Sequence, residues 1–228
     1  MPNFISEDDI EQAVVELGLR VSAKNIPDIV YTYRSGRSEL PDAVLAFGRW
    51  AIEGRGKGLY AFRRLERSPY FDVPSDSVII PIPDATPQIV LRYQNSDEQA
   101  VLARIRYNRL VDIFTGLTCY HLQSHFRTSI TTIGQIEIDD LYIGINSVGE
   151  GFIIPIEAKV ESAKDQLGVI QVTSMVQHAL DNFPDLTVRP LGIKVMRDGS
   201  IMFLEFTAEF DPNKVATVMY KRYQLVRD

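Results

Sequence analysis

Residues 134–160 read GQIEIDDLYIGINSVGEGFIIPIEAKV. Two apolar runs with the length and composition of β-strands flank a turn over 147–151, so we predict strands over 135–146 and 152–160. Both runs contain charged residues, which buried strands rarely carry without a partner or a function. These residues are Glu137, Asp139 and Asp140 in the first run and Glu157 and Lys159 in the second.

Strand geometry predicts which of these side chains can meet. Side chains two positions apart point to the same face of a strand, so Glu157 and Lys159 share a face and Ala158 points to the other. The preceding strand presents Glu137, Asp139 and Leu141 on one face, and Ile136, Ile138, Asp140 and Tyr142 on the other. If this strand lies beside the second one, either Asp139 or Asp140 can be the partner of Glu157.

This combination of side chains suits a divalent metal ion. Mg²⁺ prefers oxygen ligands and usually keeps several waters. Asp139 or Asp140, Glu157 and the backbone carbonyl of Ala158 can supply oxygens, with a phosphate and water as further ligands. Such an ion activates water and neutralises charge on a phosphoryl group, while Lys159 orients or deprotonates the attacking water. We therefore predict a Mg²⁺ site, with Mn²⁺ as a substitute, that hydrolyses phosphodiesters.

The surrounding residues predict an α/β fold of the α+β kind with a mixed central sheet. Its elements are a helix over 97–116 starting at Ser96-Asp97-Glu98, strands over 118–132, 135–146 and 152–160, a helix over 164–180, and strands over 187–196 and 200–207. Glu98 could approach the metal from the first helix.

Cys119, His121 and His125 could form a zinc site, but no fourth ligand has a conventional spacing. We expect the histidines to face solvent or DNA.

The N-terminal part has a different organisation. A helix N-cap at Ser6, short helices, and a hairpin with a basic, glycine-rich tip at 54–58 are typical of a winged-helix-like module. We predict an accessory DNA-binding region over 1–75, a proline-rich junction over 76–96 and a catalytic domain over 97–228. The expected DNA contacts are Arg55, Lys57, Arg63 and Arg64 in the hairpin and Arg127 in the catalytic domain.

Composition sets further limits. The 228 residues carry a formal net charge of −6, so DNA binding requires positive charge to be concentrated locally. Cys119 is the single cysteine, which excludes an internal disulfide and fits a reducing compartment. We expect a cytoplasmic protein without a membrane partner, because no apolar run is long enough to span a bilayer and the first residues lack signal-peptide features. We expect no nucleotide cofactor, since the glycine-rich turn lacks a Lys-Ser/Thr ending.

Asp139, the Glu157-Ala158-Lys159 triplet and the element order around them resemble the PD-(D/E)xK nuclease superfamily. The resemblance covers roughly residues 97–207. The stretches GQIEIDDLYIG and IIPIEAK, with DQLGVIQ after them, are similar to uncharacterised restriction-endonuclease-like bacterial proteins. One departure is that Ile138, and not proline, precedes the first aspartate.

The resemblance implies a restriction-endonuclease-like αβββαβ core and a metal-dependent endodeoxyribonuclease that leaves a 5′-phosphate. It implies that Asp139 or Asp140 binds the metal together with Glu157, and that Lys159 is catalytic. The acidic-x-Asp pattern of the family favours Asp139. Gln171 occupies a position where many members have a glutamine near the active site. Many such enzymes act as homodimers. The alternative is a non-catalytic DNA-binding or scaffold protein on a nuclease fold.

Overall fold

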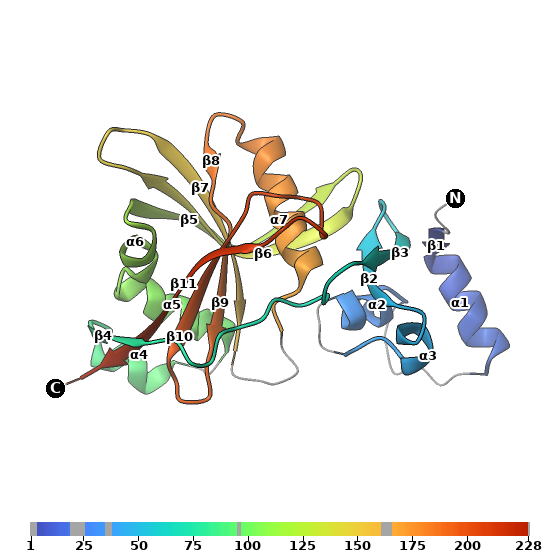
Figure 1. Cartoon of the computed structure of the whole chain (residues 1–228), viewed down its shortest axis with the longest axis horizontal. Helices are drawn as coiled ribbons and strands as arrows, with labels where there is room; N and C mark the ends of the chain where they lie inside the picture. The colour runs from blue at the N-terminus through green and yellow to red at the C-terminus, as the bar shows by residue number, and fades with distance from the viewer. Residues whose placement is uncertain (1–3, 19–25, 35–37, 95–96, 161–165, 228) are drawn as a thin grey trace.

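Strands β6 (Gly134–Ile145) and β7 (Gly151–Lys159) correspond to the two predicted apolar strands (Figure 1). The computed structural model describes residues 4–18, 26–34, 38–94, 97–160 and 166–227. The other strands are β1 Phe4–Ser6, β2 Arg49–Gly54, β3 Leu59–Leu65, β4 Ile79–Pro83, β5 Thr118–Ile130, β8 Thr187–Val188, β9 Leu191–Val195, β10 Ile201–Phe206 and β11 Thr217–Val226. The helices are α1 Glu7–Glu16, α2 Ile26–Arg34, α3 Asp42–Leu45, α4 Gln88–Tyr93, α5 Glu98–Tyr107, α6 Leu110–Thr115 and α7 Val169–Asn182.

The central sheet is mixed, as the sequence predicts. Within the described residues it has eight strands in the order β4-β11-β10-β9-β7-β6-β5, with β8 beside β7. β5, β6 and β7 form an antiparallel meander, and β9, β10 and β11 are also antiparallel. β9 runs parallel to β7, and β4 runs parallel to β11. A parallel neighbour needs a crossover connection, and α7 lies in the connection between β7 and β9.

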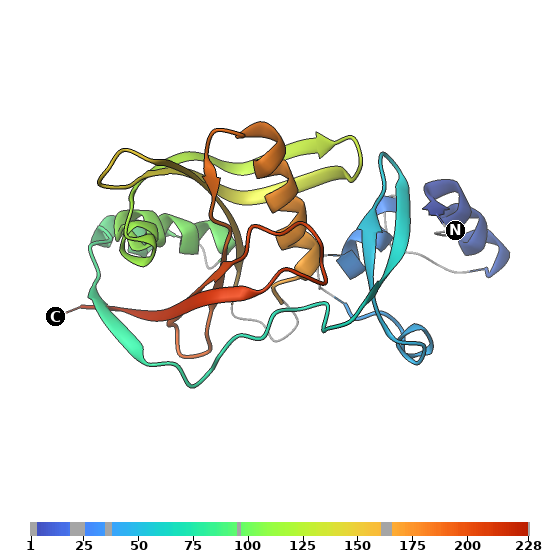
Figure 2. The ribbon, with the colours of Figure 1, turned by 45° about the horizontal axis from the view of Figure 1, so that its top comes forward.

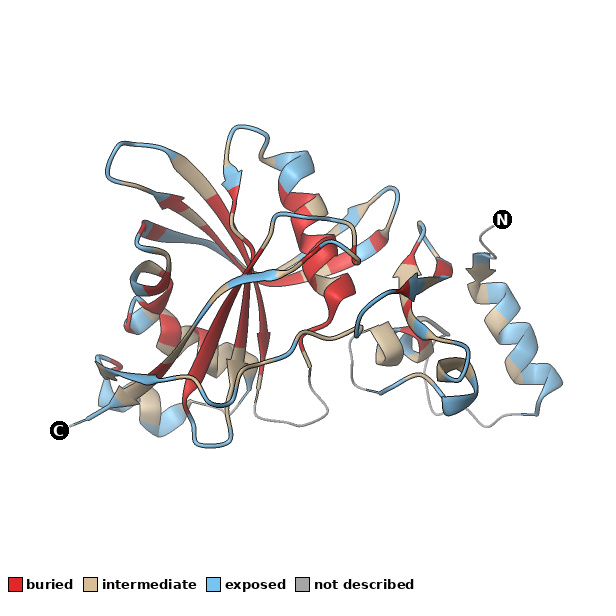
Figure 3. Ribbon diagram, in the orientation of Figure 1, coloured by how far each residue is buried: buried red, intermediate tan, exposed pale blue. Residues whose placement is uncertain are grey.

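Helices cover both faces of this sheet, and the strands between them are buried (Figure 3). On one face, Leu102 and Ile105 of α5 and Phe114 of α6 pack on the sheet. On the other face, Val172 and Met175 of α7 belong to a second apolar cluster. Burial of apolar side chains on both sides is the main stabilising contribution to such a layered fold.

The helix predicted over 97–116 is divided in two in the structure. α5 ends at Tyr107, and the helix is interrupted because Arg109 adopts a left-handed conformation with φ of 50°. The Asn108 amide donates to Asp84 Oδ1 at 3.2 Å and to Thr86 Oγ1 at 3.0 Å. These partners are distant in sequence, so local helix propensity does not reveal the break. Ser96 and Lys164, the predicted first residues of two helices, lie outside the described residues.

The segment 76–96, predicted as a junction, is part of the domain that it was expected to precede. Its strand β4 pairs with β11, a strand that the sequence patterns do not predict. Just before it, the Phe71 ring packs against Phe206 with ring centroids 4.2 Å apart. The boundary between the two parts of the chain therefore lies before Phe71.

Residues 4–65, the N-terminal module, contain short helices and a three-stranded sheet in the order β1-β3-β2. The predicted cap at Ser6 is confirmed: its side chain and that of Asp9 form a capping box at the start of α1. The predicted hairpin is also present, as β2 and β3. Figure 2 shows the module at one end of the molecule, with this hairpin beside the β5–β6 turn.

The hairpin touches that turn without space for a side chain. A Cβ atom placed on Gly54 would lie 1.8 Å from the backbone oxygen of Ile133, and one on Gly134 would lie 2.6 Å from the oxygen of Gly56. We expect Gly54→Ala to separate the hairpin from the turn and to lower the free energy of unfolding by about 1–3 kcal/mol. Urea unfolding monitored by circular dichroism measures this loss. An unchanged midpoint would show that the contact is loose.

Candidate active site

The charged residues of β6 and β7 meet where these strands run side by side. The antiparallel register pairs Asp140 with Ile156, which brings Asp139 level with Glu157. The Asp139 carboxylate accepts a hydrogen bond from the Ala158 N–H at 2.8 Å. Asp139, and not Asp140, therefore lies beside Glu157.

Lys159 and Gln171 join these two carboxylates. Lys159 Nζ lies 2.8 Å from Glu157 Oε1. The Gln171 side chain, from the first turn of α7, donates to the same oxygen at 2.5 Å. Asp139, Glu157 and Lys159 are only 9%, 4% and 7% exposed. We call Asp139, Glu157, Lys159 and Gln171 the carboxylate cluster.

The four residues of the carboxylate cluster include two carboxylates and one ammonium group. Burial, and next the Glu157 carboxylate, raise the pKa of Asp139 well above the ordinary value of an aspartate. Glu98 of α5 adds a smaller effect in the same direction, as its position near the predicted metal suggested. The Gln171 Oε1 atom is covered and has no hydrogen-bond partner within the described residues. A positive charge beside the two carboxylates would favour the ionised form of Asp139.

The oxygen donors of the cluster fit a Mg²⁺ ion. In the parts of the chain that the structure describes, no three His, Cys, Asp or Glu side chains are arranged to hold a metal. Mg²⁺ is commonly held by only one or two protein carboxylates, with waters and substrate phosphates as the other ligands. Asp139 and Glu157 form such a pair, and the raised pKa of Asp139 reflects burial first and then repulsion from Glu157, which a cation would relieve.

Asp140, the other aspartate predicted as a metal ligand, belongs to a separate network. Its carboxylate is fully buried and lies 3.3 Å from Arg106 of α5 and 3.0 Å from His121. It also accepts hydrogen bonds from Ser124 at 2.7 Å and from Tyr142 at 3.2 Å. The structure therefore assigns Asp140 to the packing of α5 on the sheet and not to the carboxylate cluster.

Asp139 and Asp140 point to opposite faces, as adjacent strand residues do, but β6 does not alternate regularly along its whole length. The sequence predicts that Ile138 and Tyr142 share a face, but Ile138 packs in the cluster that contains α7 and Tyr142 in the one that contains α5. The pairing of β5 with β6 shifts register between His121 and Gln123, and it has no pair at His125 and Asp139, where His125 has a φ of 47°. Such an irregularity changes the direction of neighbouring side chains.

The zinc alternative is not realised among the described residues. His121 is engaged by Asp140, whereas His125 pairs with Glu137 at 3.1 Å. Cys119 is buried in the core near α6, where burial raises the pKa of its thiol. The three side chains therefore have separate environments.

Lys194 of β9 is a neighbour of the carboxylate cluster that lies outside the sequence motif. Parallel pairing places it beside Lys159, and its Nζ donates to the Val160 carbonyl at 2.7 Å. It thereby holds the end of β7, directly after Lys159. A lysine within the apolar strand LGIKV was the available signal, because buried strands seldom carry charge.

The predicted DNA contacts fall into two groups. Arg55, Arg63 and Arg127 form ion pairs with acidic residues of the chain, whose partners are Glu53, Asp211 and Glu137. Lys57 and Arg64 are exposed and form no ion pair with any described residue. Lys57 and Arg64 are therefore the better candidates to contact a phosphate, because no intramolecular ion pair has to break first.

Comparisons of the chain with protein-family models, with curated proteins and with solved structures find no match. No helix in the described ranges has both the length and the apolar character needed to cross a membrane. The chemistry of the carboxylate cluster is therefore the basis for a functional assignment.

Proposed function

We propose that the protein is a Mg²⁺-dependent nuclease of the PD-(D/E)xK type that hydrolyses DNA phosphodiester bonds. The observation that carries this proposal is the carboxylate cluster, in which two acidic side chains and a lysine are buried together on adjacent strands. Buried like charges destabilise a fold, and strongly shifted pKa values of this kind are found most often at functional sites.

The order of the elements also supports this proposal. α5 and α6, then β5, β6 and β7, then α7 and β9 follow the αβββαβ order of the superfamily. The antiparallel meander, with β9 parallel to β7, gives the mixed sheet that the resemblance implies.

Each residue of the cluster has a role in this proposal. Asp139, Glu157 and the carbonyl of Ala158 would hold Mg²⁺. When bound, the ion supplies Lewis acidity toward a phosphate and lowers the pKa of water. Lys159 orients the attacking water and stabilises negative charge that develops on the phosphate. Gln171 holds Glu157 in place through its hydrogen bond.

DNA is the proposed partner, and cleavage would leave a 5′-phosphate. The N-terminal module, in particular Lys57 and Arg64, would contact the DNA backbone. A cytoplasmic homodimer completes the proposal. The main alternative is a non-catalytic DNA-binding protein on the same fold, which the retention of both carboxylates and Lys159 disfavours.

A metal titration and a cleavage assay test the proposal together. We expect the purified protein to convert supercoiled plasmid to cut forms with Mg²⁺ or Mn²⁺, and EDTA to stop the reaction. We also expect Mn²⁺ to raise the melting temperature, because it binds only the folded cluster. A metal-induced rise without cleavage would favour the non-catalytic alternative. The absence of both effects would contradict the metal site itself.

The role of the hairpin is tested by the salt dependence of DNA binding. We expect the double variant Lys57→Gln/Arg64→Gln to weaken binding and to lower the slope of log affinity against log salt by about 0.9 for each lost phosphate contact. Arg55→Gln/Arg63→Gln serves as the comparison, because both arginines are already ion-paired, and we expect a smaller change. An unchanged slope in the first variant would remove the hairpin from the proposed interface.

A further inference from the structure

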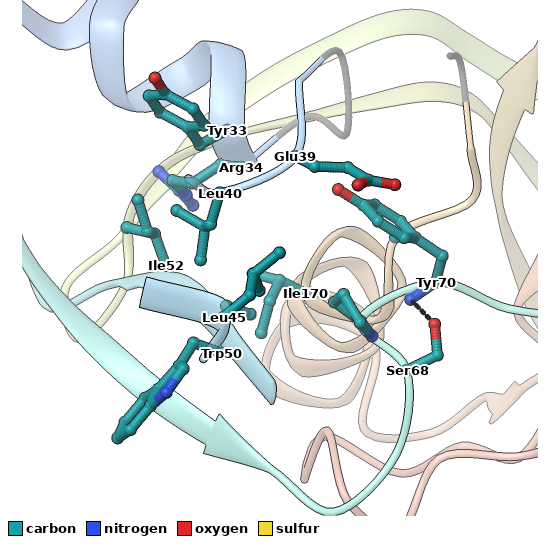
Figure 4. Close-up of a pocket in the computed structure, with 13 residues that line it drawn as sticks. Tyr33, Arg34, Glu39, Leu40, Leu45, Trp50, Ile52, Ser68, Tyr70 and Ile170 are labelled. Atoms are coloured by element: carbon teal, nitrogen blue, oxygen red, sulfur yellow. Dashed lines mark hydrogen bonds between the residues drawn. The ribbon is translucent and has the colours of Figure 1, made fainter. Parts of the chain in front are cut away.

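A hollow of about 190 Å³ lies between the N-terminal module and the start of α7 (Figure 4). Arg34, Leu40 and Ile52 of the module line one side. Tyr70 and Ile170 line the other. Its walls are therefore mostly apolar, with a few polar groups, which is the usual composition of a small-molecule site.

Arg34 is the feature of this hollow that requires an explanation. Its Nε atom is covered, and its guanidinium forms neither a hydrogen bond nor an ion pair with any described residue. Burial lowers its pKa, and the carboxylate that acts on it is Glu53, which is itself ion-paired with Arg55 and Arg63. A guanidinium held away from water is costly unless an anion meets it.

The other end of the hollow has the opposite polarity. Figure 4 shows Glu39 and Tyr70 close together, across the hollow from the Arg34 guanidinium. Burial, and next the Glu39 carboxylate, raise the pKa of Tyr70. This end offers a carboxylate and a hydroxyl as hydrogen-bond acceptors, whereas the Arg34 end offers donors.

We propose that this hollow binds a small flat molecule with an anionic group at one end and a hydroxyl or amino group at the other. The anion pairs with Arg34, the ring lies between Leu40, Ile52 and Ile170, and the polar end meets Glu39 and Tyr70. The proposal does not depend on nuclease activity, because none of these residues belongs to the carboxylate cluster.

The position of the hollow connects an occupant to that cluster. Tyr70 forms a β-bridge with Gly168, and the backbone N–H of Val169 donates to the Pro69 carbonyl at 2.9 Å. Ile170 lines the hollow, and the next residue, Gln171, donates to Glu157. A bound molecule therefore contacts the N-terminal module and the start of α7 at the same time.

The test uses three probes that separate the ring from the charge: 4-hydroxybenzoate, 4-hydroxybenzamide and acetate. Isothermal titration calorimetry on the whole chain measures the binding of each probe. We expect saturable binding of 4-hydroxybenzoate and binding at least about tenfold weaker for the amide and for acetate, because each lacks one part of the interaction. Equal binding of acid and amide, or no saturable binding of the acid, overturns the proposal.

Variants of Arg34 identify the group that recognises the anion. We expect Arg34→Met to remove the preference for the acid over the amide, and Arg34→Lys to retain part of it. Arg92→Met, a change at an exposed arginine of α4, should leave the preference at its wild-type value. Retention of the full preference in Arg34→Met overturns the proposal. If that variant does not fold, the comparison of acid and amide on the wild-type chain decides.

Discussion

Asp139→Asn is expected to stabilise the metal-free protein and, at the same time, to lower DNA cleavage by at least about 100-fold. Asparagine has nearly the same shape and can still accept the hydrogen bond from the Ala158 N–H. It removes a carboxyl whose ionisation is opposed by burial and by Glu157, so we expect the free energy of unfolding to rise by about 1–2 kcal/mol in EDTA at neutral pH. Thermal unfolding with and without Mn²⁺, together with the plasmid assay, measures both effects.

The stabilisation by Asp139→Asn should depend on pH in a defined direction. The pKa of Asp139 is raised on folding from the ordinary value of 3.8. The stabilisation of the folded state by the protonated Asp139 carboxyl is therefore fully present below pH 3.8. It is lost as the pH rises toward the folded-state pKa. We expect the variant to lose less stability than the wild-type chain over this window. A difference that is independent of pH would contradict the assigned cause.

Asp140→Asn is the matched control, because it changes the adjacent carboxylate in the same way. Asp140 is ion-paired with Arg106 and hydrogen-bonded to Ser124 and Tyr142. Its loss leaves a partly buried arginine without its carboxylate, so we expect destabilisation by about 3–5 kcal/mol. Opposite stability changes in the two variants are the expected outcome. A destabilised Asp139→Asn protein would show that Asp139 is a structural residue.

Lys159→Met is expected to lower cleavage by about 10²–10³-fold, because the ammonium group is placed to stabilise charge on the reacting phosphate. Its effect on stability should be opposite to that of Asp139→Asn. It removes the ammonium group from beside Glu157 and leaves two carboxyl groups together. The free energy of unfolding of the metal-free protein should therefore fall by about 3 kcal/mol. Single-turnover cleavage well below the melting temperature measures the first effect, and thermal unfolding the second.

Two further variants separate chemistry from folding. Lys214→Met removes an exposed lysine outside the cluster, and it should cleave DNA at the wild-type rate. In the double variant Asp139→Asn/Lys159→Met one carboxylate and one ammonium are lost together, so the two stability changes should partly cancel. Wild-type cleavage by folded Lys159→Met protein would exclude the proposed role of Lys159.

Much of the fold follows from local sequence patterns. Alternation and turn residues predict β5, β6 and β7 within a few residues of their observed ends, and the capping box at Ser6 marks the start of α1. These features depend on bonded geometry and on near neighbours in the chain. The break at Asn108, the strand β11 and the addition of β4 to the sheet depend on distant contacts. No local pattern contains that information.

The same distinction between local sequence pattern and distant contacts applies to the candidate site. The sequence by itself determined that Glu157 and Lys159 share a strand face, because the period of a β-strand is a property of the backbone. Only the tertiary structure decided that Asp139 joins them and that Asp140 turns to Arg106. Strand alternation separates the two side chains, and the pairing of β6 with β7 and the packing of α5 decide which of them meets Glu157. Burial, which shifts the pKa of Asp139, is likewise a property of the packed fold and not of the sequence motif.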